Sequence, residues 1–263
     1  MRFAARWSCL VGCVAVLAVL SAGSLIAAEP PAAPKVSTFA PAKDLVSQVD
    51  YYVDRLDTVV KSESEYKDSG DKVVKDANTL VVIALALGLH DEESKYKKAA
   101  PDLLKASQKL AASKDFESAK AGVAAVKEAL SASGDPAALK WEKVASLKAL
   151  MEQVPLINSR LKRYLRGPRF KSMAKDTAGD SAAIAAIAQG SMADTEAVKK
   201  AGDEEKWYKF CAQMRDAAGA VNAAIHAGDQ EAADAALKKL TQSCDDCHAV
   251  FQPQQKPQKK EEK

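Results

Sequence analysis

The chain has 263 residues, 48% of them hydrophobic and 28% charged, with a formal net charge of +3. Such a near balance of charge creates no global field that would attract nucleic acid, so we expect no nucleic-acid partner. The length suits two small domains better than one.

The N-terminus has the pattern of a secretory signal peptide. Arg2 and Arg6 precede an apolar run, 8–20, which is followed by small residues that end at Ala28. We expect cleavage after Ala28 and therefore export to the periplasm. Ile26, three positions before that bond, is less usual there than Ala and leaves a retained membrane anchor as the alternative, although the apolar run is short for a spanning helix.

The mature chain divides into segments of different composition. A Pro- and Ala-rich linker, 29–42, and a Gln-, Lys- and Glu-rich tail, 253–263, are both predicted to be disordered. Between them lie about 210 residues rich in Ala, Lys, Glu and Leu, which predict an all-α body. The expected helices cover about 43–61, 66–89, 92–112, 115–131, 138–165, 178–192, 195–226 and 229–251.

An internal repeat divides the body into two. Five residues recur at one constant offset: Leu45, Gln48, Val49, Arg55 and Leu56 match Leu150, Gln153, Val154, Arg160 and Leu161. Asp115 and Asp229 also match, each placed to cap the helix that follows. The repeat predicts two tandem up-and-down four-helix bundles, 43–134 and 135–252.

The sequence Cys244-Asp245-Asp246-Cys247-His248 has the CxxCH spacing of a covalent haem c attachment site. Cys244 and Cys247 would form thioethers to the haem vinyl groups, and His248 would be the proximal iron ligand. A bare CxxC is also compatible with a redox disulfide or with half of a zinc site, but the remaining Cys and His residues of the mature chain do not lie at ligand spacing.

Helical spacing places this motif on one face of the last predicted helix. The residues of that face advance by three or four positions: Leu237, Leu240, Cys244, Cys247, His248 and Phe251. A haem attached there would lie against the core of the second bundle, where burial tunes the iron.

The segment from Met214 to Phe251, with its Ala-rich face, its Ala-Gly-Asp turn and its CxxCH, resembles the C-terminal helix pair of the cytochrome c prime family. The resemblance covers the second repeat and extends weakly over the first. It implies a four-helix bundle with a distal residue on the first helix, and it places Met151 at that distal position. A distal Met implies six-coordinate iron, whereas a Met at this position is also a common core residue.

Two positions depart from the family pattern. Leu147 stands where relatives often carry an Arg that pairs with a haem propionate, and Gln252 stands where a basic residue commonly follows the aromatic. The first repeat lacks the motif altogether and is expected to bind no haem. Its counterparts of Cys244, Cys247, His248 and Met151 are Leu130, Ser133, Gly134 and Val46.

Several other residues have two interpretations. Cys211 lies on one helical stripe with Trp207 and Phe210. We predict that Cys211 is a buried apolar residue rather than a reactive thiol. We predict that Trp207 and Phe210 pack in the core rather than stack on a haem. The remaining histidines, His90 and His226, are predicted to be solvated and not to bind iron. The basic run from Arg160 to Lys171 is expected to be a solvated face, with docking of an acidic partner or neutralisation of propionates as the alternatives.

No enzyme motif competes with the CxxCH. The sequence therefore predicts a periplasmic, non-enzymatic c-type cytochrome that carries one covalent haem and transfers one electron. Its expected partners are redox proteins and the haem-attachment machinery, and a homodimer or an internal pseudo-dimer is possible. The alternatives are a haem protein that binds NO or CO, and an interaction protein in which haem only stabilises one bundle.

Overall fold

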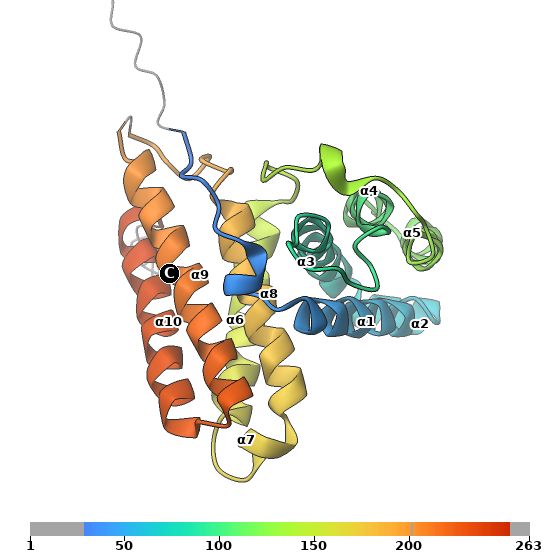
Figure 1. The fold of residues 1–263 in the computed structure, drawn as a ribbon. Coiled ribbons are helices and arrows are strands. Elements are labelled where there is room, and N and C mark those ends of the chain that lie inside the picture. Colours follow the sequence, from blue (N-terminus) through green and yellow to red (C-terminus); the bar gives the residue numbers. More distant parts are fainter. Residues whose placement is uncertain (1–28, 201, 253–263) are drawn as a thin grey trace, which may run out of the picture.

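The structure, a computed structural model, describes residues 29–200 and 202–252, and in these ranges it contains only helices (Figure 1). The α-helices are α1 (Ala42–Val59), α2 (Glu63–Ser69), α3 (Asp71–Gly88), α4 (Ala100–Ala111), α5 (Phe116–Ala129), α6 (Leu147–Tyr164), α7 (Arg169–Ser172), α8 (Ala174–Ser191), α9 (Glu204–Ala227) and α10 (Gln230–Phe251). Short 3-10 helices cover Val36–Thr38 and Pro136–Ala138. The predicted signal peptide and tail lie outside the described residues. None of the described helices is long and apolar enough to cross a membrane.

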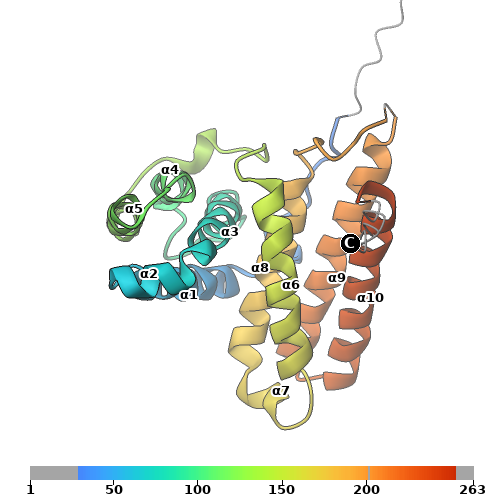
Figure 2. The same cartoon turned by 180° about the vertical axis from the view of Figure 1, so that it is seen from behind.

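The two halves of the chain arrange their helices differently. In the second half, α6, α8, α9 and α10 run side by side, with α7 at one end (Figures 1 and 2). In the first half, α3, α4 and α5 are seen nearly end-on while α1 lies lengthwise across them. The all-α fold class is thus as predicted, whereas α1 departs from a simple up-and-down arrangement.

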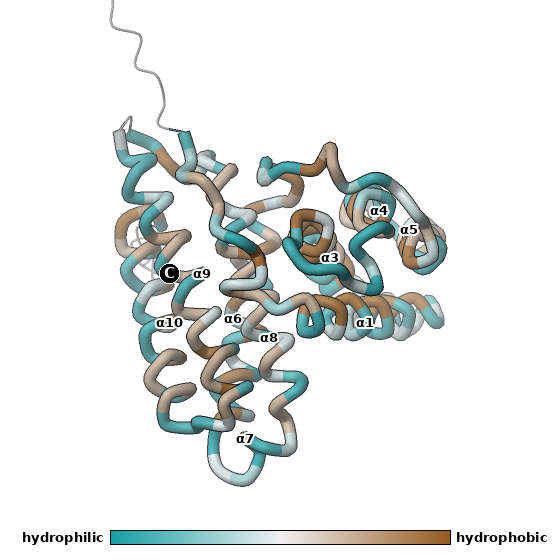
Figure 3. The backbone as a smooth tube through the Cα atoms, viewed as in Figure 1, coloured by the Kyte–Doolittle hydropathy of each residue, from teal (hydrophilic) through white to brown (hydrophobic). Residues whose placement is uncertain are grey.

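One hydrophobic core extends through both halves. α1 and α3 pack against α6 and α8, and a single cluster of buried residues includes side chains from all four helices. α3 is buried continuously over 76–88 and α8 over 177–191, so both are central helices covered on all sides. Figure 3 shows the hydrophobic character of α3. The halves therefore do not have two separate cores.

Two equivalent ion pairs lie where the halves meet. In the first half, Arg55 Nε lies 2.7 Å from a carboxylate oxygen of Asp76, whose side chain has no exposed surface. In the second half, Arg160 donates two hydrogen bonds to Asp180, at 2.9 and 2.5 Å. Tyr51 links the pairs, because its hydroxyl accepts from Arg55 and its ring lies 5.3 Å from the Arg160 guanidinium.

The repeated glutamines reach across the same junction. Gln153 of α6 donates to Asp76 of α3, at 3.2 Å, and to the Tyr52 hydroxyl of α1, at 3.1 Å. Its counterpart Gln48, on α1, lies directly against Gly179 of α8. Each half thus places the matching glutamine against the other half.

Several helix boundaries differ from those expected. The predicted helix 66–89 is interrupted at Gly70, which separates α2 from α3. The predicted helices 92–112, 138–165 and 195–226 begin eight or nine residues late, and loops precede them. α8 begins earlier than expected, directly after α7.

The part of the predicted linker that directly precedes α1, 36–41, is packed, contrary to the expectation of disorder, whereas residues 29–33 are exposed. Val36, Phe39 and Ala40 are at most 3% exposed, and the backbone of Phe39 lies against Gly219 of α9. The carbonyl oxygen of Ala40 also lies 3.1 Å from Nε2 of His90. We call residues 36–40 the strap, because this segment of small and apolar residues crosses the second half.

The two predicted caps are confirmed. The Asp115 carboxylate accepts a hydrogen bond from the backbone N–H of Ser118 at the start of α5. The Asp229 carboxylate accepts from the N–H of Ala232 at the start of α10. Each satisfies a donor that the first turn of a helix leaves free.

Candidate haem site

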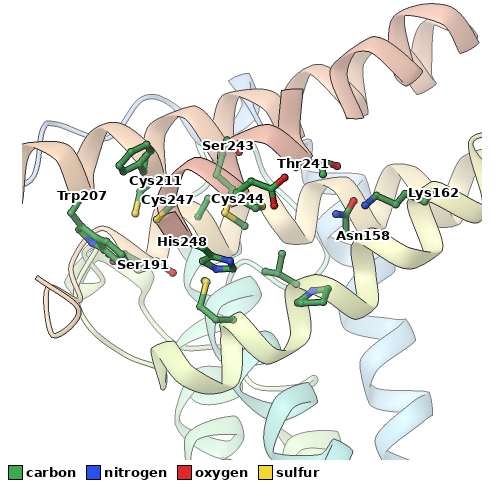
Figure 4. Close-up of a pocket in the computed structure, with 17 residues that line it drawn as sticks. Asn158, Lys162, Ser191, Trp207, Cys211, Thr241, Ser243, Cys244, Cys247 and His248 are labelled. Atoms are coloured by element: carbon green, nitrogen blue, oxygen red, sulfur yellow. The ribbon is translucent and has the colours of Figure 1, made fainter. Parts of the chain in front are cut away.

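The CxxCH motif lies in the last two turns of α10, opposite α6. α10 packs mainly against α9 and contacts α6 at few points, which leaves a slot between α6 and α10. The slot contains a cavity of about 270 Å³ lined by side chains of α6, α8, α9 and α10 (Figure 4). Met151, Cys244, Cys247 and His248 all line it, so the structure brings the four sequence-predicted residues together.

The cavity opens toward the solvent on a second side. There a neighbouring hollow of about 520 Å³ shares Met151, Trp207, Cys247 and His248 with the first cavity. The hollow extends to Leu147 and Lys148 at the start of α6. The two hollows are thus neighbours, and Cys247 and His248 of the motif line both of them.

Neither a disulfide nor an ion pair with a described residue engages the motif side chains. Cys244 and Cys247 are half-buried thiols that form no disulfide. Burial raises the pKa of Cys244, and burial together with the charge of Cys244 raises the pKa of Cys247 to about 11, so both are neutral at pH 7. The exposed His248 ring forms no hydrogen bond with a described residue, which leaves its nitrogens available to a metal.

Met151 faces this motif from a locally weakened helix. Pro155 lies four residues later inside α6 and also lines the cavity. Because Pro has no backbone N–H, the carbonyl of Met151 receives no helical hydrogen bond from that position. A flexible thioether side chain on such a turn can adjust its position, which suits a ligand as well as a gap-filling residue.

Aromatic side chains close one end of the cavity. Trp207 is 4% exposed, and its indole N–H donates to the carbonyl of Ser191 at 3.1 Å. Its ring meets that of Phe251 edge-on, with 5.3 Å between centroids, and Phe210 meets Phe251 in the same way. Trp207 therefore belongs to a small core cluster, as predicted, and lines the cavity as well.

Cys211 lies in the same region and is buried, as predicted. It is 6% exposed, and burial together with nearby Cys247 raises its pKa. Figure 4 shows it next to Cys247, on the cavity wall. A buried, protonated thiol is a poor nucleophile, which agrees with its prediction as an apolar wall residue.

The opposite end of the cavity is polar, and sequence analysis did not single it out. The side-chain oxygen of Asn158 is buried there without a hydrogen-bond partner, and Lys162 lies beside it (Figure 4). Lys162 is close enough to lower the pKa of Cys244 against the larger effect of burial. Met151, Asn158 and Lys162 are separated by seven and four residues, a spacing that could have indicated a common helix face.

The first half has no equivalent of this site. α5 ends at Ala129, so Leu130 is its C-cap, and Ser133 and Gly134 lie beyond the helix. The N–H of Gly134 instead donates to the carbonyl of Lys98 at 2.8 Å. The positions that match the motif therefore do not share a helix face in the first half.

The other two histidines lie away from the cavity, but His90 is not solvated as expected. It is 2% exposed, with Nε2 facing the Ala40 carbonyl and Nδ1 accepting from the N–H of Glu92 at 3.0 Å. His226 is partly exposed and lies 2.7 Å from a carboxylate oxygen of Asp44. His226 thus connects the two halves, and His90 connects the first half to the strap.

The donor set fits a covalent haem. Two adjacent thiols, an unengaged imidazole, an opposing thioether and apolar walls line one space. In the described ranges no group of three or more His, Cys, Asp or Glu side chains is arranged to hold a bare metal ion.

Comparison with known proteins adds no family to this description. No protein-family model, no curated protein and no solved structure matches the chain.

Proposed function

We propose that the chain is an exported, periplasmic c-type cytochrome whose second half, 135–252, carries one covalent haem and transfers single electrons without catalysing a reaction. Cys244 and Cys247 would hold the haem, His248 would be the proximal iron ligand and Met151 the distal one. The observation that carries the proposal is that side chains of the CxxCH motif and Met151 line the same cavity from two facing helices.

A haem bound in this position would supply a one-electron iron couple. The chain's own residues would hold it and set its surroundings. Two thioether bonds would fix it to α10, and the sulfur of Met151 would fill the distal side from α6. The Trp207 and Phe251 rings would keep water from one end of the site, which favours a ligand set that changes little with oxidation state.

A second candidate is a haem that binds NO or CO. It is favoured by the half-buried position of Met151 on the turn that Pro155 weakens, because a distal ligand on such a turn is easier to displace. The electron-transfer function requires Met151 to stay on the iron, whereas gas binding requires it to leave or to be absent.

The spin state separates these two candidates. The wild-type protein is expected to give a low-spin, six-coordinate absorption spectrum, and Met151→Leu a high-spin spectrum with ready CO binding to the ferrous form. Leu has a similar volume, so the fold should persist. Met214→Leu is the matched control, because Met214 lines the same cavity from α9 and should leave the spectrum low-spin. A high-spin wild-type protein would favour gas binding.

The haem count tests the attachment itself. One haem per chain is expected in a pyridine haemochrome assay, and Cys244→Ala with Cys247→Ala should abolish covalent attachment, whereas Cys211→Ala should retain it. A ratio of two haems per chain would contradict the proposal that the first half binds none.

For the first half, we propose the role of an internal partner that covers α6 and α8. The shared core and the exchange of Gln48 and Gln153 across the junction support this role. Export is tested separately: N-terminal sequencing of the mature protein should give Glu29, and Met1 in a membrane fraction would support the anchored alternative.

A further inference from the structure

One end of the second half carries a concentrated positive charge. Six exposed cations lie between the last turn of α6 and the first turn of α8, and we name them the basic cluster: Lys162, Arg163, Arg166, Arg169, Lys171 and Lys175. Among the described residues, none of the six forms an ion pair. Asp176 is the one acid next to them in the chain, although the chain as a whole is nearly neutral.

Helix stability does not explain the whole cluster. Lys162 and Arg163 lie in the last turn of α6, where the helix dipole favours cations. Lys175, however, lies in the first turn of α8, where the dipole disfavours a cation. Mutual repulsion adds to that cost, so the charges are better explained by something that they bind.

The basic cluster adjoins the proposed haem site. Lys162 is the member of the cluster that lines the haem cavity, and it lines a neighbouring groove together with Arg166, Lys238, Asp234 and Asp245. The other mouth of the cavity is balanced in charge, because two cations, Lys148 and Lys199, line it together with Glu152 and Glu196. The excess of exposed cations therefore lies at the α7 end of the second half.

We propose that the basic cluster is the docking surface for an acidic face of a redox partner protein, which it holds at the α7 end of the haem cavity. The proposal rests on the proposed electron-transfer function. A membrane surface fits less well, because a helix or loop that lies on lipid presents large apolar side chains among its cations. Here Leu165 and Phe170 are buried at 0% and 3% exposure.

Two triple variants with the same change in net charge test this surface in the full, haem-loaded chain. The cluster variant is Arg163→Glu, Arg166→Glu and Arg169→Glu. The control variant is Lys105→Glu, Lys109→Glu and Lys114→Glu, at exposed positions in and after α4 of the first half. Lys162 is left unchanged because it lines the cavity.

The first measurement is binding of a synthetic poly-glutamate peptide, which does not depend on haem. Wild type and control are expected to bind it at low ionic strength, and the cluster variant about tenfold more weakly. The second is stopped-flow reduction of the ferric protein by the anionic Fe(II)–EDTA complex, which gives up one electron to become Fe(III)–EDTA. The cluster variant should react about tenfold more slowly than wild type, and added salt should remove the difference.

Each outcome has a distinct meaning. Equal peptide binding by the two triple variants would overturn the docking surface, even if haem is present. Protein without covalent haem that still shows cluster-dependent peptide binding would overturn the proposed function and leave the surface standing. Binding of anionic phospholipid vesicles that only the cluster variant loses would assign the surface to a membrane and overturn the proposal.

Discussion

Replacing Asp76 by Asn should change how stability depends on pH. Asp76 is a carboxylate with no exposed surface, and burial raises its pKa from 3.8 to about 6, against the opposing effects of Arg55 and Gln153. The folded state therefore binds the proton more tightly than the unfolded state does. The free energy of unfolding should fall as pH rises from 4 to 7, since each unit of difference in pKa corresponds to about 1.4 kcal/mol.

The expected size follows from these pKa values. A difference of roughly two units gives about 3 kcal/mol that Asp76 costs the folded protein at pH 7 and does not cost at pH 4. Asn resembles the protonated carboxyl and does not titrate. Asp76→Asn should therefore match wild type at pH 4 and be about 3 kcal/mol more stable at pH 7. In this variant Arg55 keeps its charge but has no carboxylate partner. The charge is tolerated because Arg55 is 24% exposed and also donates to Tyr51.

Urea unfolding followed by circular dichroism between pH 4 and 7.5 measures this difference, with both proteins in the same haem-loaded state. Asp57→Asn is the control, because that carboxylate lies on α1, the helix of Arg55, is 55% exposed and has Lys127 as its partner. A variant that is several kcal/mol less stable than wild type at pH 7 would refute the reasoning. It would mean that the Arg55 pair outweighs the cost of burying the charge.

Two further substitutions test packing and capping. Gly179→Ala should lower the free energy of unfolding by about 1 to 3 kcal/mol, because the added Cβ would overlap the Gln48 amide at the junction of the halves. Urea unfolding measures this loss. An unchanged midpoint would show that Gln48 can move aside. Asp229→Ala should cost about 1 kcal/mol by removing the N-cap of α10, and the same assay applies. A loss well below that of Asp115→Ala, the equivalent cap of α5, would show that other contacts hold the start of α10.

The sequence predicts best those features that depend on local spacing. The caps at Asp115 and Asp229 agree with expectation, and so do the bounds of α10. These features depend on side chains that lie only a few residues away in the sequence. The start of α4 was missed for the opposite reason. Residues 92–99 are polar enough to continue a helix, but the buried ring of His90 accepts the N–H of Glu92 and holds the chain in a loop.

In the candidate site, too, the residues set by local spacing could be predicted and those set by helix packing could not. The spacing of Cys244, Cys247 and His248 is local and identifies the motif. Which other side chains surround the motif depends on how four helices pack, so the unpartnered Asn158 and the wall residue Pro155 emerged only from the structure. Met151 lies between these cases, because its position was inferred from a family resemblance and the structure places it in the same cavity as the motif.

The buried carboxylates at the junction could not be predicted from hydrophobic patterning. Asp76 and Asp180 each lie inside a helix, where a single acid usually marks the solvent side. The repeat does contain a signal, since Arg55 and Arg160 match at one offset and the two acids match at nearly the same offset. Pairing the repeated arginines with acids at equivalent positions would have predicted both ion pairs.

The junction also indicates what the first half contributes to the second. α8 is buried along 177–191, and part of that surface is covered by α1 and α3 of the first half. Small residues such as Gly179 let Gln48 approach closely, so α8 is shaped for this neighbour. Without the first half, α8 would lose the cover of α1 and α3, including the Val82 side chain against Gly190, and the Arg160–Asp180 pair would lose Tyr51. The first half thus stabilises the helix that packs between α6 and α9, two helices that form walls of the cavity next to the CxxCH motif.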